Sequence, residues 1–202
     1  MTGRILRSMN KHEAKKERLL ELGLEVMQIR GYNGTSVKDI VDAAAVPKGS
    51  FYTYFDSKEV FAIEAIERVA SQNFQQAETV LRDRARNPLD RLDVFFNSQA
   101  DTACVSEFRI GCFMGNMCQE MADSSELIRQ TVKQTLGNIT DLIAQVLTEA
   151  SQQGDISVDQ DCPATANFLF NSWQGALLRM KAEKSREPLD AFLSLLPKVL
   201  AV

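Results

Sequence analysis

Residues 31–61, GYNGTSVKDIVDAAAVPKGSFYTYFDSKEVF, decide how the amino-terminal part of this chain folds. Residues 31–34 end a preceding helix, because glycine and asparagine tolerate the positive φ of a helix stop. Ser36 can cap the next helix, and a tight turn at residues 46–49 leads into a short aromatic helix at residues 48–55. Two short helices joined by such a turn predict a helix-turn-helix.

The aromatic helix has one apolar and one polar side. Phe51 and Phe55 are four residues apart, so both side chains can face the interior of a small helical domain. The side chains that point outward then carry hydroxyl groups, and they belong to Ser50, Tyr52, Thr53 and Tyr54. Hydroxyl groups donate to phosphate oxygens, and threonine can also touch a thymine methyl group. The spacing alone also fits an aromatic core helix with a random polar face.

The order of these features resembles the signature segment of the TetR family of bacterial repressors. The glycine-aromatic helix stop, the Thr-Ser cap, the VPKGSFY turn and helix, and the YF-x-SKE-x-F end all match. The resemblance implies that a recognition segment enters the major groove of DNA, with the matching residues Pro47, Lys48, Gly49, Ser50, Tyr52, Thr53 and Tyr54. Thr35 and Lys58 match positions that anchor the DNA backbone, and Lys38 is a further candidate for a phosphate contact.

A basic arm before and early in the first helix is a second candidate DNA contact. Its members are Arg4, Arg7, Lys11, Lys15 and Lys16. A solvated terminus explains the same charges equally well, and His12 is most simply a surface residue there. Residues 1–60 carry 10 Lys/Arg against 8 Asp/Glu, whereas residues 61–202 carry 13 against 19. A DNA-binding head on an acidic body has this distribution of charge.

The whole chain reads as helix, so we expect an all-α protein. A head at residues 1–60 holds the helix-turn-helix, and a body at residues 61–202 binds the ligand and forms the dimer. Beyond the short aromatic helix, a long fourth helix follows the possible caps Asp56 and Ser57. The later helices are expected after Asn87-Pro88, between Gly111 and residues 123–125, and at residues 126–153, 163–184 and 188–199.

Several classes of protein are disfavoured by composition. No signal peptide or membrane-spanning run is visible, which predicts a cytoplasmic protein with no membrane partner. The four cysteines lack paired spacing and there is one histidine, so neither a zinc site nor a cofactor is expected. No nucleophile–base pair or phosphate loop is apparent, which disfavours an enzyme.

The body also resembles a narrower group of repressors, those that respond to acrylate-type and other electrophilic compounds. Residues 109–121, RIGCFMGNMCQEM, and residues 173–189, WQGALLRMKAEKSREPL, carry this resemblance. If the two segments meet, they form a cavity with an aromatic wall, two amides, a thiol and an amine, suited to a small acid or carbonyl compound. The candidate effector-binding residues are Arg109, Cys112, Asn116, Gln119, Trp173, Gln174 and Lys181.

Two properties of that cavity follow from its side chains. Arg109 and Arg179 can pair with a carboxylate, and Lys181 near a thiol would lower the pKa of Cys112. The alternative for Cys112 is a small apolar filler, and Trp173 fits a core position as well as a ligand wall.

The family resemblance implies a homodimer formed by the last two helices, which binds a palindromic DNA operator. The apolar residues suited to that interface are Phe168, Leu169, Ala176, Leu177, Phe192, Leu195, Leu196 and Val199. We therefore expect a repressor that a small-molecule effector releases from DNA. The alternative is a DNA-binding regulator without a ligand, although about 140 residues beyond the head argue against it.

Overall fold

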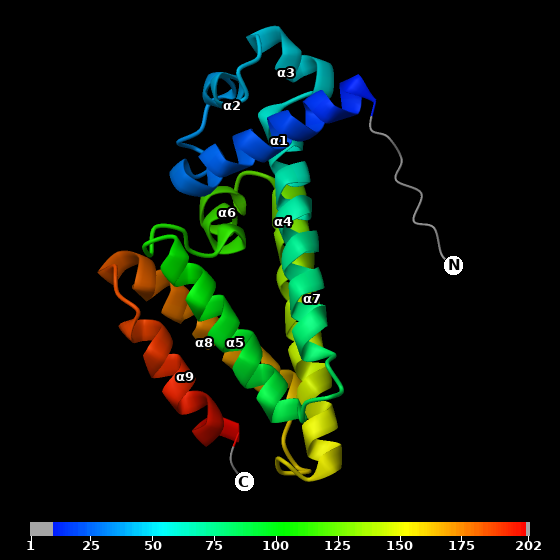
Figure 1. The fold of residues 1–202 in the computed structure, drawn as a ribbon, viewed down its shortest axis with the longest axis vertical. Helices are drawn as coiled ribbons and strands as arrows, with labels where there is room; N and C mark the ends of the chain where they lie inside the picture. Colours follow the sequence, from blue (N-terminus) through cyan, green and yellow to red (C-terminus); the bar gives the residue numbers. More distant parts are fainter. Residues whose placement is uncertain (1–9, 201–202) are drawn as a thin grey trace. The chain divides into compact units, whose positions relative to one another are not determined.

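The computed structural model describes residues 10–200, apart from the side chain of Lys11, and every regular element in that range is an α-helix (Figure 1). The expected all-α class is therefore confirmed. The helices are α1 (Lys11–Arg30), α2 (Val37–Ala43), α3 (Lys48–Tyr54), α4 (Lys58–Leu81), α5 (Pro88–Val105), α6 (Phe113–Met121), α7 (Glu126–Gln153), α8 (Cys162–Glu183) and α9 (Glu187–Leu200).

The glycine stop of α1 and the Ser36 cap of α2 are as expected, and Asn10 adds a cap at the start of α1 that we did not predict. Asn10 and Glu13 form a capping box at the start of α1, and Gly31, with φ 75°, ends that helix. At α2, the Ser36 side chain accepts from the Asp39 N–H, and the Asp39 carboxylate accepts from the Ser36 N–H at 2.8 Å. Local hydrogen bonds thus fix where each helix begins.

Aromatic rings form the centre of the head. Phe51 and Phe55 are fully buried, and Phe61 of α4 packs against both with ring-centroid distances of 5.8 and 5.0 Å. Ile40 of α2 and Met27 of α1 complete this core. The predicted inward direction of Phe51 and Phe55 is confirmed, and it fixes which side of α3 faces outward.

Helices α3, α8 and α9 differ slightly from their expected bounds, as does α6, which begins at Phe113. Helix α3 ends at Tyr54 because Phe55 is extended, with φ −137°. Helix α8 begins at Cys162, since the Asp161 side chain accepts from the Ala164 N–H and so caps the helix one residue earlier than expected. Helix α9 runs one residue further at each end than predicted.

The body is a layered helical unit in which α8 packs against α7 and α9, and α5 against α7 and α9. Buried Arg91 of α5 ties three of its segments together. Its guanidinium donates to Glu149 of α7 at 2.7 Å and to the Leu81 and Arg86 carbonyls at 3.3 and 3.1 Å. Every buried charge of this kind needs such partners.

The chain divides into two compact units between Ala65 and Ile66. The sequence placed the boundary at residue 60, and the fourth helix runs through both positions. Within residues 10–200, no helix combines the length and the apolar character needed to cross a membrane.

Candidate functional site

The outward face of α3 is the candidate DNA-binding face. Tyr52 is 56% exposed, and Lys48, Gly49 and Thr53 are exposed as well. A Cβ atom added at Gly49 would meet nothing within 4 Å, so the surface around this backbone is open. Pro47, also exposed, precedes the helix with an extended backbone. The face therefore offers hydroxyl groups, an ammonium group and open backbone together.

Two further members of the recognition segment are only half-exposed. Ser50 is partly buried, and the Tyr54 ring rests against the His12 ring of α1 with centroids 4.6 Å apart. His12 is exposed, as expected, but it also packs against the recognition helix. The neighbouring helix thus limits how the Tyr54 side chain can turn.

Thr35 differs from its expected role. Its side chain is buried, and its hydroxyl group donates to the Gly31 carbonyl at 2.7 Å. Its backbone N–H donates to the Tyr32 carbonyl at 3.2 Å. Because both donors are satisfied inside the loop, Thr35 holds the turn between α1 and α2 in place of the predicted contact with the DNA backbone.

The lysines expected to anchor DNA lie in three different environments. Lys38 is exposed and pairs with Asp42 at 2.8 Å. Lys58 is half-buried, and its ammonium donates to the Tyr32 and Thr35 carbonyls at 3.0 and 2.9 Å. Of the three, Lys48 alone stands on the outward face of α3.

The expected basic arm is described only in part. Arg4 and Arg7 lie outside the described residues, as does the side chain of Lys11. Lys15 is exposed, whereas Lys16 pairs with Glu64 at 2.7 Å and lies 5.1 Å from the centroid of the Phe55 ring. Lys16 therefore has a partner within the head.

In the body, Cys112 caps α6 instead of lying within it. The helix begins one residue later, and the Cys112 Sγ accepts from the Gly115 N–H at 3.4 Å. A side-chain hydrogen bond also links Cys112 to Gln174 of α8. Burial raises the pKa of the Cys112 thiol, and these hydrogen bonds only partly oppose that effect. The predicted lowering of this pKa by Lys181 is wrong, because desolvation dominates.

The expected meeting of α6 and α8 does occur around Cys112. A Cβ atom at Gly111 would lie 3.3 Å from Cδ of Lys181, and one at Gly115 would lie 3.7 Å from Oε1 of Gln174. A thiol, an amide and the stem of a lysine thus come together here. Asn116, half-buried, starts the next turn, and its N–H donates to the Cys112 carbonyl at 3.0 Å.

Three residues expected in the same cavity are elsewhere. Gln119 is exposed, whereas Cys112, which caps the helix, is half-buried. Arg109 is 75% exposed and pairs with Glu107 at 3.4 Å. Trp173 is 2% exposed and belongs to the core, where its ring packs on Phe96 and Phe192 at 5.4 and 5.2 Å.

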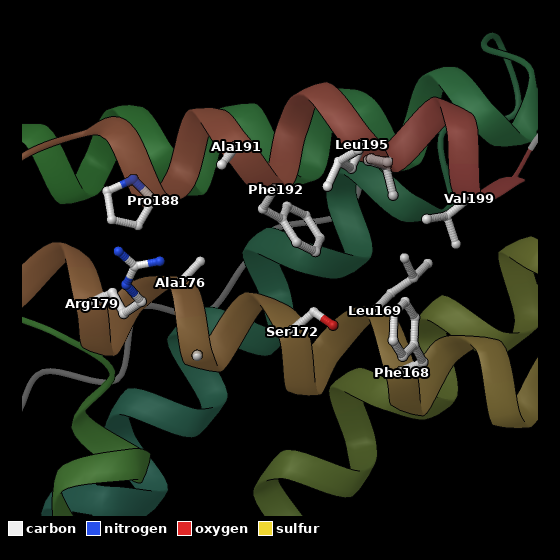
Figure 2. Close-up of a pocket in the computed structure, with 12 residues that line it drawn as sticks. Phe168, Leu169, Ser172, Ala176, Arg179, Pro188, Ala191, Phe192, Leu195 and Val199 are labelled. Atoms are coloured by element: carbon white, nitrogen blue, oxygen red, sulfur yellow. The ribbon is translucent and has the colours of Figure 1, made fainter.

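An apolar groove of about 330 Å³ lies between α8 and α9. Figure 2 shows Phe168, Ser172 and Ala176 of α8 opposite Phe192 and Leu195 of α9. The lining residues that we did not single out for an interface are Ser172, Gly175, Arg179, Pro188 and Ala191. Their spacing could have revealed them, because residues three or four apart lie on the same side of a helix. Ser172, Gly175 and Arg179 have this spacing on α8, and Pro188 and Ala191 have it on α9.

Comparisons with known proteins agree with both units. The model of the bacterial regulatory proteins of the tetR family matches residues 19–65, and that of the tetracyclin repressor-like C-terminal domain matches residues 88–196. The transcriptional repressor DhaR of Mycobacterium sp. (strain GP1) is 35% identical over 92% of this chain and 91% of its own. The regulator AcuR of Cereibacter sphaeroides is 34% identical over 86% and 80%.

Solved structures give the same result. A regulatory protein TetR from Rhodobacter sphaeroides superposes with a TM-score of 0.86 at 32% identity, covering 92% of this chain and 98% of its own. The reduced form of NemR from E. coli superposes with a TM-score of 0.81 at 27% identity, covering 93% and 98%. Regulators of this kind bind DNA as dimers and are not enzymes. The chain belongs to the TetR family of transcriptional repressors.

Proposed function

We propose that this protein represses transcription by binding a palindromic operator as a homodimer, and that a small molecule releases it. The observation that carries the proposal is the outward face of α3, where Lys48, Tyr52 and Thr53 are exposed beside the open backbone of Gly49. Side chains of this kind contact phosphates and base edges. Gly49 allows the helix to approach a groove closely.

The dimer forms through α8 and α9. Phe168 and Leu195, which line the groove between these helices, are 56% and 52% exposed, and Val199 beside them is exposed too. Contiguous exposed apolar side chains are typical of a protein interface. A two-fold dimer presents two recognition helices related by symmetry, so its operator is palindromic.

The effector site surrounds Cys112, Gln174 and Lys181. A thiol, an amide and an amine in one place suit a small acid or carbonyl compound, which includes unsaturated acids and aldehydes. Because the raised pKa keeps Cys112 protonated, the resting thiol is a poor nucleophile. This favours reversible binding over covalent capture as the first response.

Release requires that the effector favour a form of the dimer that fits DNA poorly. Helix α4 is the segment that joins the two units, since it starts at Lys58 and ends at Leu81. The Leu81 carbonyl is held by Arg91 within the body. We therefore expect α4 to carry the change from the effector site to the head.

A gel-shift assay tests the whole proposal. Small unsaturated acids, aldehydes and quinones are screened for loss of operator binding, first with the wild type and then with Cys112→Ser and Gln174→Ala. Cys118→Ser is the matched control, because Cys118 lies in α6, the helix that Cys112 caps, but is exposed.

For reversible binding, Gln174→Ala needs more compound for release, while Cys112→Ser changes little and mass spectrometry finds no adduct. An adduct on Cys112, with the response lost in Cys112→Ser alone, would make the response covalent. A full response in both variants would place the effector elsewhere. Operator binding that no compound weakens would favour a regulator without a ligand.

A further inference from the structure

One buried side chain, that of Arg91 in α5, links this helix to α4 and α7 within the body. Its exposed fraction is 4%, and its guanidinium reaches three acceptors. It donates to the Leu81 carbonyl at 3.3 Å, to the Arg86 carbonyl at 3.1 Å and to the Glu149 carboxylate at 2.7 Å. Leu81 is the last residue of α4, Arg86 lies in the turn before α5, and Glu149 is on α7. The end of α4 is therefore tied to α7 through Arg91.

These hydrogen bonds hold the end of α4 firmly. The last carbonyl groups of a helix have no partner within it and carry the negative end of its dipole, so a cation beside Leu81 is favourable on both counts. The bond to Glu149 joins two charges, and hydrogen bonds of this kind are among the stronger ones in proteins. Separating the end of α4 from α7 would leave the buried guanidinium without one of its acceptors, which is unfavourable.

The part of α4 before this point has little attachment of its own. After Val69, the next buried residues of the helix are Ala77 and Leu81. Five of the seven residues from 70 to 76 are exposed, and none is buried. A segment with few buried contacts resists displacement weakly. The direction of α4 therefore depends strongly on how its end is held.

A small tilt at one end of α4 becomes a large displacement at the other. The helix runs over 24 residues, from Lys58 in the first compact unit to Leu81 in the second. A helix of this length extends about 36 Å, so a tilt of about 5° at one end displaces the other by about 3 Å. One base pair takes up about 3.4 Å along DNA. A displacement of this size decides which spacing of half-sites a dimer fits.

We infer that Arg91 is a positioning residue for operator recognition, one that sets the half-site spacing the dimer accepts by tying the end of α4 to α7 through Glu149. Arg91 is buried in the body and acts on DNA binding through α4 alone. The inference rests on the proposed binding of a palindromic operator by a homodimer. It adds a fixed point in the body to the role proposed for α4.

Operators with altered half-site spacing test this inference. The palindrome that the wild type selects from a random DNA library is the first probe, and the same site with one base pair added or removed at its centre gives two more. The wild type should bind each altered site at least about tenfold more weakly, a loss similar to that for one mismatched base pair. Arg91→Met keeps an apolar side chain and removes the donors. It should lose less than about threefold, because a loosely held α4 adapts to either spacing.

Arg82→Met is the matched control. Arg82 follows Leu81 directly, is exposed, and pairs with Glu78 of α4 at 2.6 Å. This variant removes the same charge from the same turn without freeing α4, so it should keep the wild-type dependence on spacing. Thermal unfolding and light scattering show which variants are folded and dimeric.

Glu149→Leu is the second variant, and it serves if Arg91→Met does not fold. The Glu149 side chain is 39% exposed, so its replacement disturbs the core little. It removes the acceptor on α7 and leaves the two carbonyl bonds of Arg91. We therefore expect Glu149→Leu to weaken the dependence on spacing by a smaller factor than Arg91→Met does.

A wild-type dependence on spacing in folded, dimeric Arg91→Met would overturn the positioning role and leave the proposed function intact. The same result in Glu149→Leu would overturn it where Arg91→Met does not fold. An equal loss of discrimination in Arg82→Met would also overturn it, because the effect would then follow from charge alone. A wild type that selects no palindrome would remove the proposed function, and the inference with it.

Discussion

The head and the body expose opposite kinds of surface although both are built from helices alone. On α3 of the head, lysine and hydroxyl side chains face outward and the phenyl rings face the core. On α8 and α9 of the body, Phe168, Leu195 and Val199 remain exposed around an apolar groove. Polar donors suit a nucleic acid, and apolar side chains suit another protein surface. The difference supports the proposal that DNA binds the head and that the second subunit binds the body.

The largest effect is expected from placing a charge on the body's apolar surface. Leu195→Arg puts an unpaired charge into the groove, so the dimer should dissociate. Operator affinity should fall by about 10² to 10⁴, because the two heads no longer bind as one unit. Light scattering and gel shifts measure both effects. Leu127→Arg, at an exposed leucine of α7 outside the groove, should change neither. A stable dimer of Leu195→Arg would contradict the assignment of the interface.

Trp173 and Tyr52 compare a buried aromatic side chain of the body with an exposed one of the head. Trp173→Ala should lower the free energy of unfolding by about 3–5 kcal/mol, since it leaves a cavity beside Phe96 and Phe192. Tyr52→Ala should change it by less than about 0.5 kcal/mol, as is usual for surface residues. Urea unfolding gives both values, and similar decreases in the two variants would contradict the placement of Trp173 in the core.

Single side chains on the recognition face should have intermediate effects. Thr53→Ala and Lys48→Ala should each alter base preference. The loss of one good contact between a side chain and a base changes the binding free energy by about 1–3 kcal/mol. Gel shifts on operators with single-base changes measure this preference. Thr79→Ala, at an exposed threonine of α4 in the second unit, is the control and should leave it unaltered. Unchanged preference in both head variants would remove α3 as the reading helix.

The smallest effect concerns the chemistry of two cysteines close together in the body. Iodoacetamide at neutral pH should modify exposed Cys118 before Cys112. Since burial raises the pKa of Cys112, its thiolate is scarce at neutral pH, and its rate should rise about tenfold per pH unit until that pKa is reached. Peptide mass spectrometry follows each site. Faster reaction at Cys112 near neutral pH would mean an activated thiol.

The two units also differ in how far their sequences could be interpreted. In the head, the caps, the glycine stop and the direction of Phe51 and Phe55 depend on residues within a few positions of each other. Local patterns of this kind can be read from sequence. The burial of Thr35 and the inward turn of Lys58 could not be predicted from sequence. The first depends on how the loop before α2 folds, and the second depends on the contact of that loop with α4, a helix distant from it in sequence.

The limit of prediction from sequence is clearer in the body. The start of α5 and both ends of α7 were predicted from their caps and breaks, and the approach of α8 to Cys112 was expected from the two segments. Gln119 has the helical spacing to Cys112 that predicted a shared face, yet it is exposed, because spacing along one helix does not show which residues other helices cover. Whether Trp173 lines a cavity or fills the core depends on Phe96 and Phe192, which come from other helices.

The central claim is that the body forms the dimer and that the head reads DNA through α3. The most direct test is to select bound duplexes from a random DNA library with the wild type and with Thr53→Ala in parallel. We predict that the wild type selects a palindrome, since a two-fold dimer presents α3 twice. Thr53→Ala should relax the same base position in both half-sites. Selection of an asymmetric site, or of an identical palindrome by both proteins, would contradict the reading of DNA by a dimer through the outward face of α3.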